Sequence, residues 1–347
     1  MSQQKALLLE KAKGSFVVSD VPILKPGPGQ LSIKVIAAAL NPVDWKIQAW
    51  GLFMKNYPAI LGSDIAGDVE DIGEGVEGFS KGDKVFCQGY FVNEMAGFQQ
   101  YTLIPADIVG KIPPNIDYGQ AATIPLGFST AAIGLLQAQP QGAGLNHTFD
   151  SKISFSGQPA FVVGGSTSVG QYAIQLLKFL GYSTIITYAS ARHTNYLKTI
   201  GATHVIDRGE VSVGSLAEAA KKIANAPIEV AYDAIGDKDS RAACTDIVVE
   251  GGLIIDVNPE AKDPEAKDSG NGKRLISVIG TSHHPPNREF GRILWKILPT
   301  LVQDGTIVPN RVEKLRSGLA GIDEGLQKMK ADKVSGVKLV AFPQETI

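Results

Sequence analysis

A glycine-rich turn between a β-branched run and a helical pattern is the segment of this sequence best suited to bind a ligand. Residues 161–170 read Phe-Val-Val-Gly-Gly-Ser-Thr-Ser-Val-Gly, and apolar residues then recur at helical spacing. A helix that begins at such a turn directs unpaired backbone N–H groups and the positive end of its dipole at an anion. The pattern predicts a nucleotide pyrophosphate site made of Gly165, Ser166, Thr167, Ser168 and Val169.

The turn departs from the usual dinucleotide fingerprint. Against G-x-G-x-x-G, the chain supplies Gly165 and Gly170 but has Thr167 where the middle glycine normally lets phosphate approach the backbone. The motif alone is weak evidence, so the surrounding sequence decides.

The segment about 20 residues beyond the turn predicts the cofactor. An acid there would hold the ribose 2′-hydroxyl of NAD, but the chain reads Tyr-Ala-Ser-Ala-Arg-His over residues 188–193. A hydroxyl from Ser190, a guanidinium from Arg192 and an imidazole from His193 suit a 2′-phosphate, and arginine pairs bidentately with phosphate oxygens. We therefore expect NADPH rather than NADH. The alternative is a solvated loop in which Ser190 caps a helix.

Composition limits the partners that these residues could serve. The 347 residues suit two domains, and 33 basic against 35 acidic residues leave a net charge of -2, so we expect neither nucleic acid nor a membrane as partner. The first residues lack the apolar core of a signal peptide, which predicts a cytoplasmic protein. Two cysteines, Cys87 and Cys244, fit a reducing compartment.

The elements that position the turn differ between the two parts of the chain. Up to about residue 123, short β-rich runs between Gly and Pro turns predict a mainly antiparallel β domain, in which the prolines, Pro42 among them, exclude long helices. Residues 137–158 predict a surface connection. Alternating strands and helices then predict a parallel, doubly wound sheet, with strands at 161–163, 184–188, 204–206, 230–235, 253–257 and 275–279. The tail, with helices near 290–301 and 318–330 and a strand at 337–342, is expected to return to the first domain.

A zinc site is not expected. Zinc ligands are clustered Cys and His residues at short spacings. None of the five histidines is paired in sequence with a cysteine, and the one cluster, His283-His284, reads as a polar loop. We predict no metal.

Five motifs in fixed order resemble the medium-chain dehydrogenase/reductase superfamily, specifically its zinc-independent quinone and enoyl reductase branch. The closest likeness is to fungal trans-acting enoyl reductases of polyketide pathways. The match covers nearly the whole chain and is carried by residues 41–46 (Asn-Pro-Val-Asp-Trp-Lys), 57–67, 82–85, 164–170 and 333–340. Zinc-using members carry a cysteine near Asp44 and Gly-His-Glu where this chain has Gly62-Ser63-Asp64.

The resemblance implies an α/β protein with two domains. A GroES-like, mainly antiparallel β domain for substrate and catalysis would comprise residues 1–124 and 281–347. A Rossmann domain with a doubly wound parallel sheet, residues 125–280, would bind NADPH.

The resemblance also implies further cofactor contacts. The residues expected to face the nicotinamide are Asn41, Pro42, Asp44, Trp45, Lys46, Thr130, Val257 and Asn258. Arg208 would lie at the adenosine side, where the family usually has tyrosine, and Lys338 and Leu339 would close over the cofactor.

The expected chemistry is reduction of an activated C=C bond in an enone, enal or enoyl thioester by hydride transfer to the β-carbon, without metal. Lys46 is the first candidate for the hydrogen-bond donor or cofactor-orienting group, Tyr57 the second, and water is an equal source of the proton. Quinone reduction and a non-catalytic NADPH-binding role are the alternatives. The expected partner is a small conjugated carbonyl compound, free or on a polyketide carrier, and the protein is expected to be a monomer or homodimer.

Overall fold

The computed structural model describes residues 2–257, 267–268 and 272–346, and the chain folds into two compact units. The first unit comprises Met1–Leu126, Leu294–Asp304 and Pro309–Ile347, and the second comprises Gly127–Ile293 and Gly305–Val308. Within the described residues, no helix combines the length and apolarity needed to cross a bilayer.

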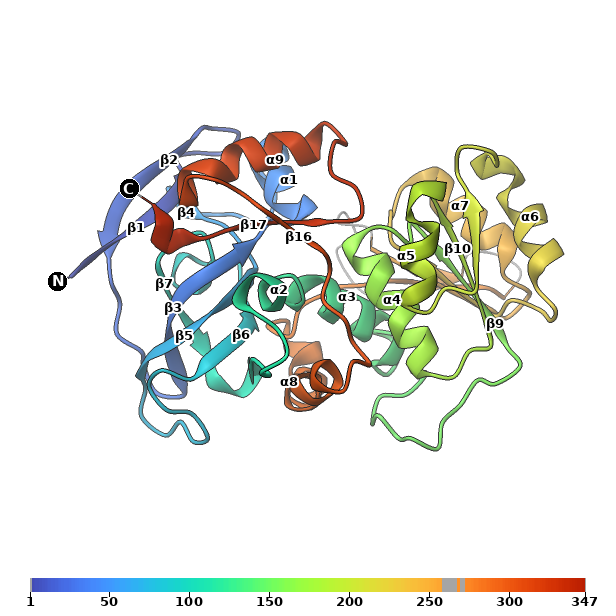
Figure 1. Cartoon of the computed structure of the whole chain (residues 1–347), viewed down its shortest axis with the longest axis horizontal. Helices are drawn as coiled ribbons and strands as arrows, with labels where there is room; N and C mark the ends of the chain where they lie inside the picture. Colours follow the sequence, from blue (N-terminus) through green and yellow to red (C-terminus); the bar gives the residue numbers. More distant parts are fainter. Residues whose placement is uncertain (1, 258–266, 269–271, 347) are drawn as a thin grey trace. The chain divides into compact units, whose positions relative to one another are not determined.

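The second unit is built on a seven-stranded sheet, and Figure 1 shows its strands among the green to orange segments. In spatial order the strands are β11 (His204–Asp207), β10 (Thr184–Ala189), β9 (Pro159–Val163), β12 (Val230–Asp233), β13 (Leu253–Asp256), β15 (Arg274–Ser277) and β14 (Lys267–Asp268). All neighbours are parallel except β14, which is antiparallel to β15. The strand order reverses at β9 and β12, which is the point where doubly wound sheets bind their ligands. The predicted parallel sheet is confirmed.

Helices connect most of these strands. They are α4 (Ser168–Phe179), α5 (Thr194–Thr199), α6 (Leu216–Ile223) and α7 (Lys238–Ile247), whereas α3 (Pro125–Leu136), whose first two residues belong to the first unit, precedes β9. Helix α4 contacts β9 and β10. Its predicted apolar face is buried, with Tyr172, Ala173, Leu176 and Leu177 fully covered.

The first unit contains two mainly antiparallel sheets, in which β16 and β17 are a parallel pair. The larger has the order β16 (Val312–Lys314), β17 (Lys338–Ala341), β3 (Gln30–Ala39), β5 (Asp64–Ile72), β6 (Lys84–Gln88) and β8 (Val109–Lys111), with β7 (Tyr101–Pro105) also paired to β3. The smaller has the order β2 (Phe16–Pro22), β1 (Gln3–Leu9) and β4 (Ala59–Ile60). In Figure 1 the red strand β17 lies beside the blue strand β3, and Val340 pairs with Ala39. The C-terminal segment therefore completes the first unit, as expected.

Four helices belong mainly to the first unit: α1 (Pro42–Trp50), α2 (Tyr118–Ala122), α8 (Arg288–Gln303) and α9 (Ile322–Lys330). Helix α1 qualifies the expectation that the prolines exclude long helices here. Pro42 is its first residue, a position where proline loses no hydrogen bond and its fixed φ favours the helix. Pro42 therefore starts a helix of nine residues instead of preventing one.

The division into units differs from the expected one at residues 281–293, which were expected in the first domain and belong to the second unit. Asn287 explains this placement. Its Nδ2 donates to the carbonyls of Ile279, at 2.7 Å, and Thr281, at 3.1 Å. These bonds fold the start of this segment back onto the end of the seven-stranded sheet of the second unit.

Candidate functional site

The glycine turn of the second unit requires glycine for steric reasons. Gly164 has a φ of 74°, in the left-handed region that side chains disfavour. A Cβ on Gly170 would lie 2.2 Å from the carbonyl oxygen of Gly164, and one on Gly165 would lie 2.0 Å from Thr187 Oγ1. The first turn of α4 therefore lies directly against the strand exit, which is the geometry that a pyrophosphate cradle needs.

Thr167, which the fingerprint would replace with glycine, has a role that sequence reasoning missed. It is the N-cap of α4, and its Oγ1 accepts a hydrogen bond of 3.0 Å from the Gly170 N–H. The side chain of Gln171 ties the same turn by donating to the Ser166 carbonyl at 3.0 Å. The backbone N–H groups of Ser166 and Val169 have no hydrogen-bond partner in the described part of the chain. The turn thus offers donors to an anion, and Ser168 is the first helical residue beside them.

The residues predicted to read the 2′-phosphate lie at the carboxyl ends of two adjacent strands. Ser190 and Arg192 follow β10 directly, His193 closes the short 3-10 helix Ala191–His193, and Arg208 follows β11. Arg192 and Arg208 are exposed, and Arg192 Nε donates to His193 Nε2 at 3.2 Å. The structure therefore brings these four residues to one edge of the sheet.

The acid nearest to this group is Asp207, which sequence reasoning did not weigh as a rival ribose ligand. One oxygen of Asp207 accepts hydrogen bonds of 3.0 Å from both the Ala191 N–H and the Gly209 N–H. Asp207 lies at the end of β11, one strand away from the position that an NAD-binding acid takes. This carboxylate oxygen supports the backbone of the two loops that carry the basic side chains.

Two other predicted cofactor residues of the second unit are described, and one is not. Thr130, on α3, is 8% exposed, and its carbonyl accepts a hydrogen bond of 3.0 Å from the Tyr232 hydroxyl. Val257 is half-buried and directly follows β13. Asn258 lies outside the described residues.

A buried polar group forms the core of the candidate site in the first unit. Lys338, at the start of β17, places its ammonium 2.8 Å from Asp64 Oδ2 and donates to Asn41 Oδ1 at 2.6 Å. Asn41 Nδ2 donates to Asp64 Oδ2 at 2.9 Å, and its backbone N–H donates to Asp44 Oδ2 at 2.8 Å. All four residues are at most 4% exposed. We call Asn41, Asp44, Asp64 and Lys338 the buried charge group.

The buried charge group changes how two predicted residues are understood. The side chain of Lys338 is held inside the unit by Asn41 and Asp64, and the carbonyl of Leu339 accepts a backbone hydrogen bond of 2.9 Å from Leu40. Asp64 is the member that sequence reasoning missed as a functional residue. Its second oxygen accepts a hydrogen bond of 2.6 Å from the Leu126 N–H. The available signal was the motif Gly62-Ser63-Asp64, in which an acid stands beside the position of a zinc-ligating histidine in relatives.

Asp44 has an unusual protonation equilibrium. It is fully buried on α1, and its Oδ1 has no hydrogen-bond partner among the residues described. Burial raises the pKa of Asp44 to about 7, opposed by the Asn41 backbone hydrogen bond and by Lys338, whereas the nearby Asp64 charge adds to the rise. The carboxyl group is therefore partly protonated near neutral pH.

We expect Asp44→Asn to remove a pH-dependent loss of stability. Because the folded-state pKa lies above the unfolded value, this carboxyl stabilises the fold most below about pH 4, and that contribution is lost as the pH rises to about 7. The stability of the variant relative to wild type should rise by roughly 2–3 kcal/mol from about pH 5 to about pH 8. Urea unfolding at both pH values measures this difference. Asp20→Asn, at an exposed ion pair with Lys5, is the control and should show no such trend.

Lys46 and Tyr57, the two catalytic candidates, lie on and just after α1. The Lys46 ammonium lies 5.8 Å from the ring centroid of Trp45 and 5.6 Å from that of Trp50. Such cation–aromatic contacts hold an ammonium without neutralising it. The Tyr57 hydroxyl is buried and has no hydrogen-bond partner within the described residues. The first unit therefore carries a half-buried cation on α1 and a buried tyrosine hydroxyl.

Comparison with known proteins places this geometry in a family. A model of the alcohol dehydrogenase GroES-like domain matches residues 27–114, and a model of the zinc-binding dehydrogenase domain matches residues 168–285. A zinc-type alcohol dehydrogenase-like protein of Schizosaccharomyces pombe is 30% identical, over 97% of this chain and 99% of its own length. The chain belongs to the medium-chain dehydrogenase/reductase family. The predicted GroES-like and Rossmann folds are thereby confirmed.

Further proteins are similar to this chain over most of its length. A trans-enoyl reductase of Aspergillus japonicus is 31% identical over 87% of this chain and 88% of its own length. Among solved structures, an alcohol dehydrogenase superfamily protein of Novosphingobium aromaticivorans has a TM-score of 0.77 at 25% identity, covering 97% of this chain and 99% of that one. A quinone oxidoreductase of Coxiella burnetii has a TM-score of 0.75 at 23% identity, covering 98% and 99%, which shows the shared fold.

Membership of this family indicates the general chemistry of the chain. Medium-chain dehydrogenases/reductases are oxidoreductases that bind a nicotinamide cofactor. The glycine turn fits that cofactor, because it leaves no room for a side chain at Gly165 and Gly170 and carries available backbone N–H donors. In the ranges 2–257, 267–268 and 272–346, no three His, Cys, Asp or Glu side chains gather as a metal site would. Cys87 and Cys244 are buried, and burial raises the pKa of both thiols.

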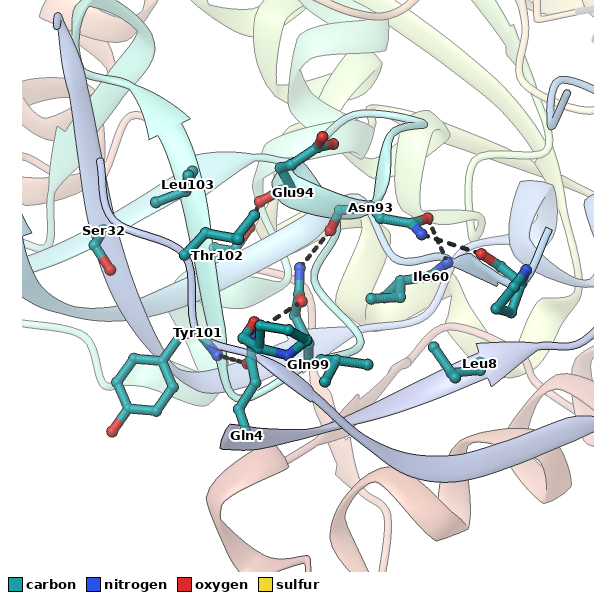
Figure 2. Close-up of a pocket in the computed structure, with 14 residues that line it drawn as sticks. Gln4, Leu8, Ser32, Ile60, Asn93, Glu94, Gln99, Tyr101, Thr102 and Leu103 are labelled. Atoms are coloured by element: carbon teal, nitrogen blue, oxygen red, sulfur yellow. Dashed lines mark hydrogen bonds between the residues drawn. The ribbon is translucent and has the colours of Figure 1, made fainter. Parts of the chain in front are cut away.

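A cavity of about 250 Å³ lies in the first unit (Figure 2) and includes none of the predicted site residues in its lining. The side-chain amides of Asn93 and Gln99, which line this cavity, form hydrogen bonds within its wall. Asn93 Oδ1 accepts from the Ile60 N–H at 2.9 Å and Asn93 Nδ2 donates to the Pro58 carbonyl at 3.1 Å, while Gln99 Nε2 donates to the Asn93 carbonyl at 2.7 Å. These bonds hold β4 against the loop before β7, so the amides serve the fold.

Proposed function

We propose that this protein is an NADPH-dependent reductase of activated C=C bonds, acting on an enone, enal or enoyl thioester. The observation that carries the proposal is the basic group at the ends of β10 and β11, where Arg192, His193 and Arg208 gather. A 2′-phosphate has the charge and the acceptor oxygens that these donors require. The trans-enoyl reductases among the relatives support the choice of reaction.

In this proposal, the second unit binds the cofactor through its backbone and the basic group. The N–H groups of Ser166 and Val169 would donate to the pyrophosphate, and Gly165 would allow its close approach. Ser190, Arg192 and His193 would surround the 2′-phosphate, and Arg208 would lie on the adenosine side. When bound, NADPH supplies a hydride for the β-carbon of the conjugated system.

In the first unit, Lys46 would act on the substrate. Its ammonium would donate a hydrogen bond to the carbonyl oxygen, where negative charge gathers as the double bond is reduced. The proton for the α-carbon would come from the Tyr57 hydroxyl, which has no partner in the described structure, or from water. The buried charge group would hold the start of α1, and with it Lys46, in place.

We expect Lys46→Met to lower kcat for an enone by about tenfold or more, because the donor to the developing oxyanion is removed. The measurement is loss of NADPH absorbance with a panel of enones, enals and quinones. Lys46→Arg keeps a cationic donor and should recover part of the rate. Lys25→Met, at an exposed lysine outside the site, is the control.

Two results would contradict the proposed function. Tight NADPH binding without turnover of any member of the panel would identify a non-catalytic binding protein. Turnover of quinones alone would identify a quinone reductase.

A further inference from the structure

Aromatic side chains at the end of α1 and in the loop after it are unusually exposed. Trp50 is 45% exposed and Phe53 is 49% exposed. The ring of Phe53 stacks on that of Phe91, with centroids 5.3 Å apart and planes inclined by 10°, and Trp45 meets Trp50 edge-on at 5.5 Å. We call Trp45, Trp50, Phe53 and Phe91 the aromatic patch. Exposed large rings that already pair with one another commonly mark a binding surface.

The backbone at Phe53 argues that this ring is placed for binding. Phe53 has a φ of 63°, in the left-handed region that is unfavourable for a bulky residue. Such strain is normally offset by burial or by function. Because about half of Phe53 remains exposed, burial offers little compensation.

The aromatic patch includes the rings that hold the proposed catalytic cation. Lys46 lies over Trp45 and Trp50, so one ring pair contacts the group that would bind the substrate carbonyl. Phe53, which stacks on Phe91 to form the second pair, follows Trp50 in the chain after Gly51 and Leu52. A molecule whose carbonyl is held by Lys46 therefore meets the rings of Trp45 and Trp50 beside that carbonyl.

We propose that the aromatic patch binds a flat, apolar extension of the substrate, so that the preferred substrates are conjugated carbonyl compounds carrying an aryl or polyene group. The inference rests on the proposed function, because it takes Lys46 as the carbonyl donor. Offset and edge-on contacts with the rings favour planar, conjugated groups. Short enones lack such a group and gain nothing from the patch.

The test compares two enones that differ in the extension: 3-penten-2-one, which carries a methyl group, and 4-phenyl-3-buten-2-one, which carries a phenyl group. Wild type should show a higher kcat/KM for the phenyl enone. Phe53→Gly should lower the ratio of the two kcat/KM values by about fivefold to tenfold. Glycine accepts the left-handed backbone, so this variant should fold normally. Val17→Ala, at an exposed apolar residue on β2, is the control and should leave the ratio unchanged.

Two readouts separate this inference from the proposed function. Reduction of both enones with the same ratio in wild type and Phe53→Gly would overturn the inference and leave the proposed function intact. If neither enone is reduced, quenching of tryptophan fluorescence by 4-phenyl-3-buten-2-one still reports binding. Weaker quenching of the variant than of wild type supports the inference, and equal quenching overturns it.

Discussion

Lys338→Met is expected to lower the free energy of unfolding by about 3–5 kcal/mol. The Lys338 ammonium is 4% exposed and lies 2.8 Å from Asp64 Oδ2 and 2.6 Å from Asn41 Oδ1. Methionine would leave the fully buried carboxyl groups of Asp64 and Asp44 without their cation. Removal of one partner from a buried pair is costly because the remaining charge can reach neither water nor a counter-charge.

Chemical denaturation of wild type and variant at neutral pH measures this loss. The control is Lys314→Met, which breaks a surface pair with Glu345 whose side chains are 53% and 47% exposed, and it should cost less than about 1 kcal/mol. Adding Asp64→Asn to the Lys338 variant should restore part of the stability, because the uncompensated charge is then gone. Equal, small losses for the two lysine variants would contradict the role given to the buried charge group.

The second large effect is expected for cofactor choice: Arg192→Ala should raise the Kd for NADPH by about 10- to 100-fold, the usual range for a lost charge-assisted hydrogen bond. Arg192 is exposed directly after β10 and bonds to His193, so its guanidinium is accessible to a phosphate. NADH has no 2′-phosphate, and its Kd should change by less than about twofold.

Fluorescence titration with each cofactor measures both constants. Arg292→Ala, at an exposed arginine on α8 in the second unit, is the control and should affect neither cofactor. Equal weakening of NADPH and NADH by Arg192→Ala would refute the assignment of the 2′-phosphate. In wild type, the difference between the Kd values for NADPH and NADH should also shrink with added salt, because Arg192 is exposed.

The parallel sheet could be predicted from sequence because its strands are buried on both faces. All four residues of β12 and of β13 are buried, so each appears as a short apolar or β-branched run between helical patterns. The apolar face of α4 could be predicted from the spacing of its apolar residues for the same reason, because burial of one side of a helix determines which positions are apolar.

Features that depend on distant partners could not be predicted. Lys338 and Asn41 are 297 residues apart, and nothing in either local pattern indicates that a lysine in a strand will be buried against an asparagine before a helix. The role of Thr167 was hidden because a fingerprint compares residue types and does not show which hydroxyl caps a helix. Residues 281–293 were placed in the other domain because the two hydrogen bonds of Asn287 have no sequence signature.

The pairing of β17 with β3 has a consequence for biosynthesis. The ribosome translates β1 to β8 before the second unit, and β16 and β17 after it. Asp44 and Asp64 are therefore translated long before Lys338, so the nascent first unit carries two acids without the cation that neutralises them. The second unit precedes those last strands in the chain, so it can fold co-translationally while the first is still unfinished.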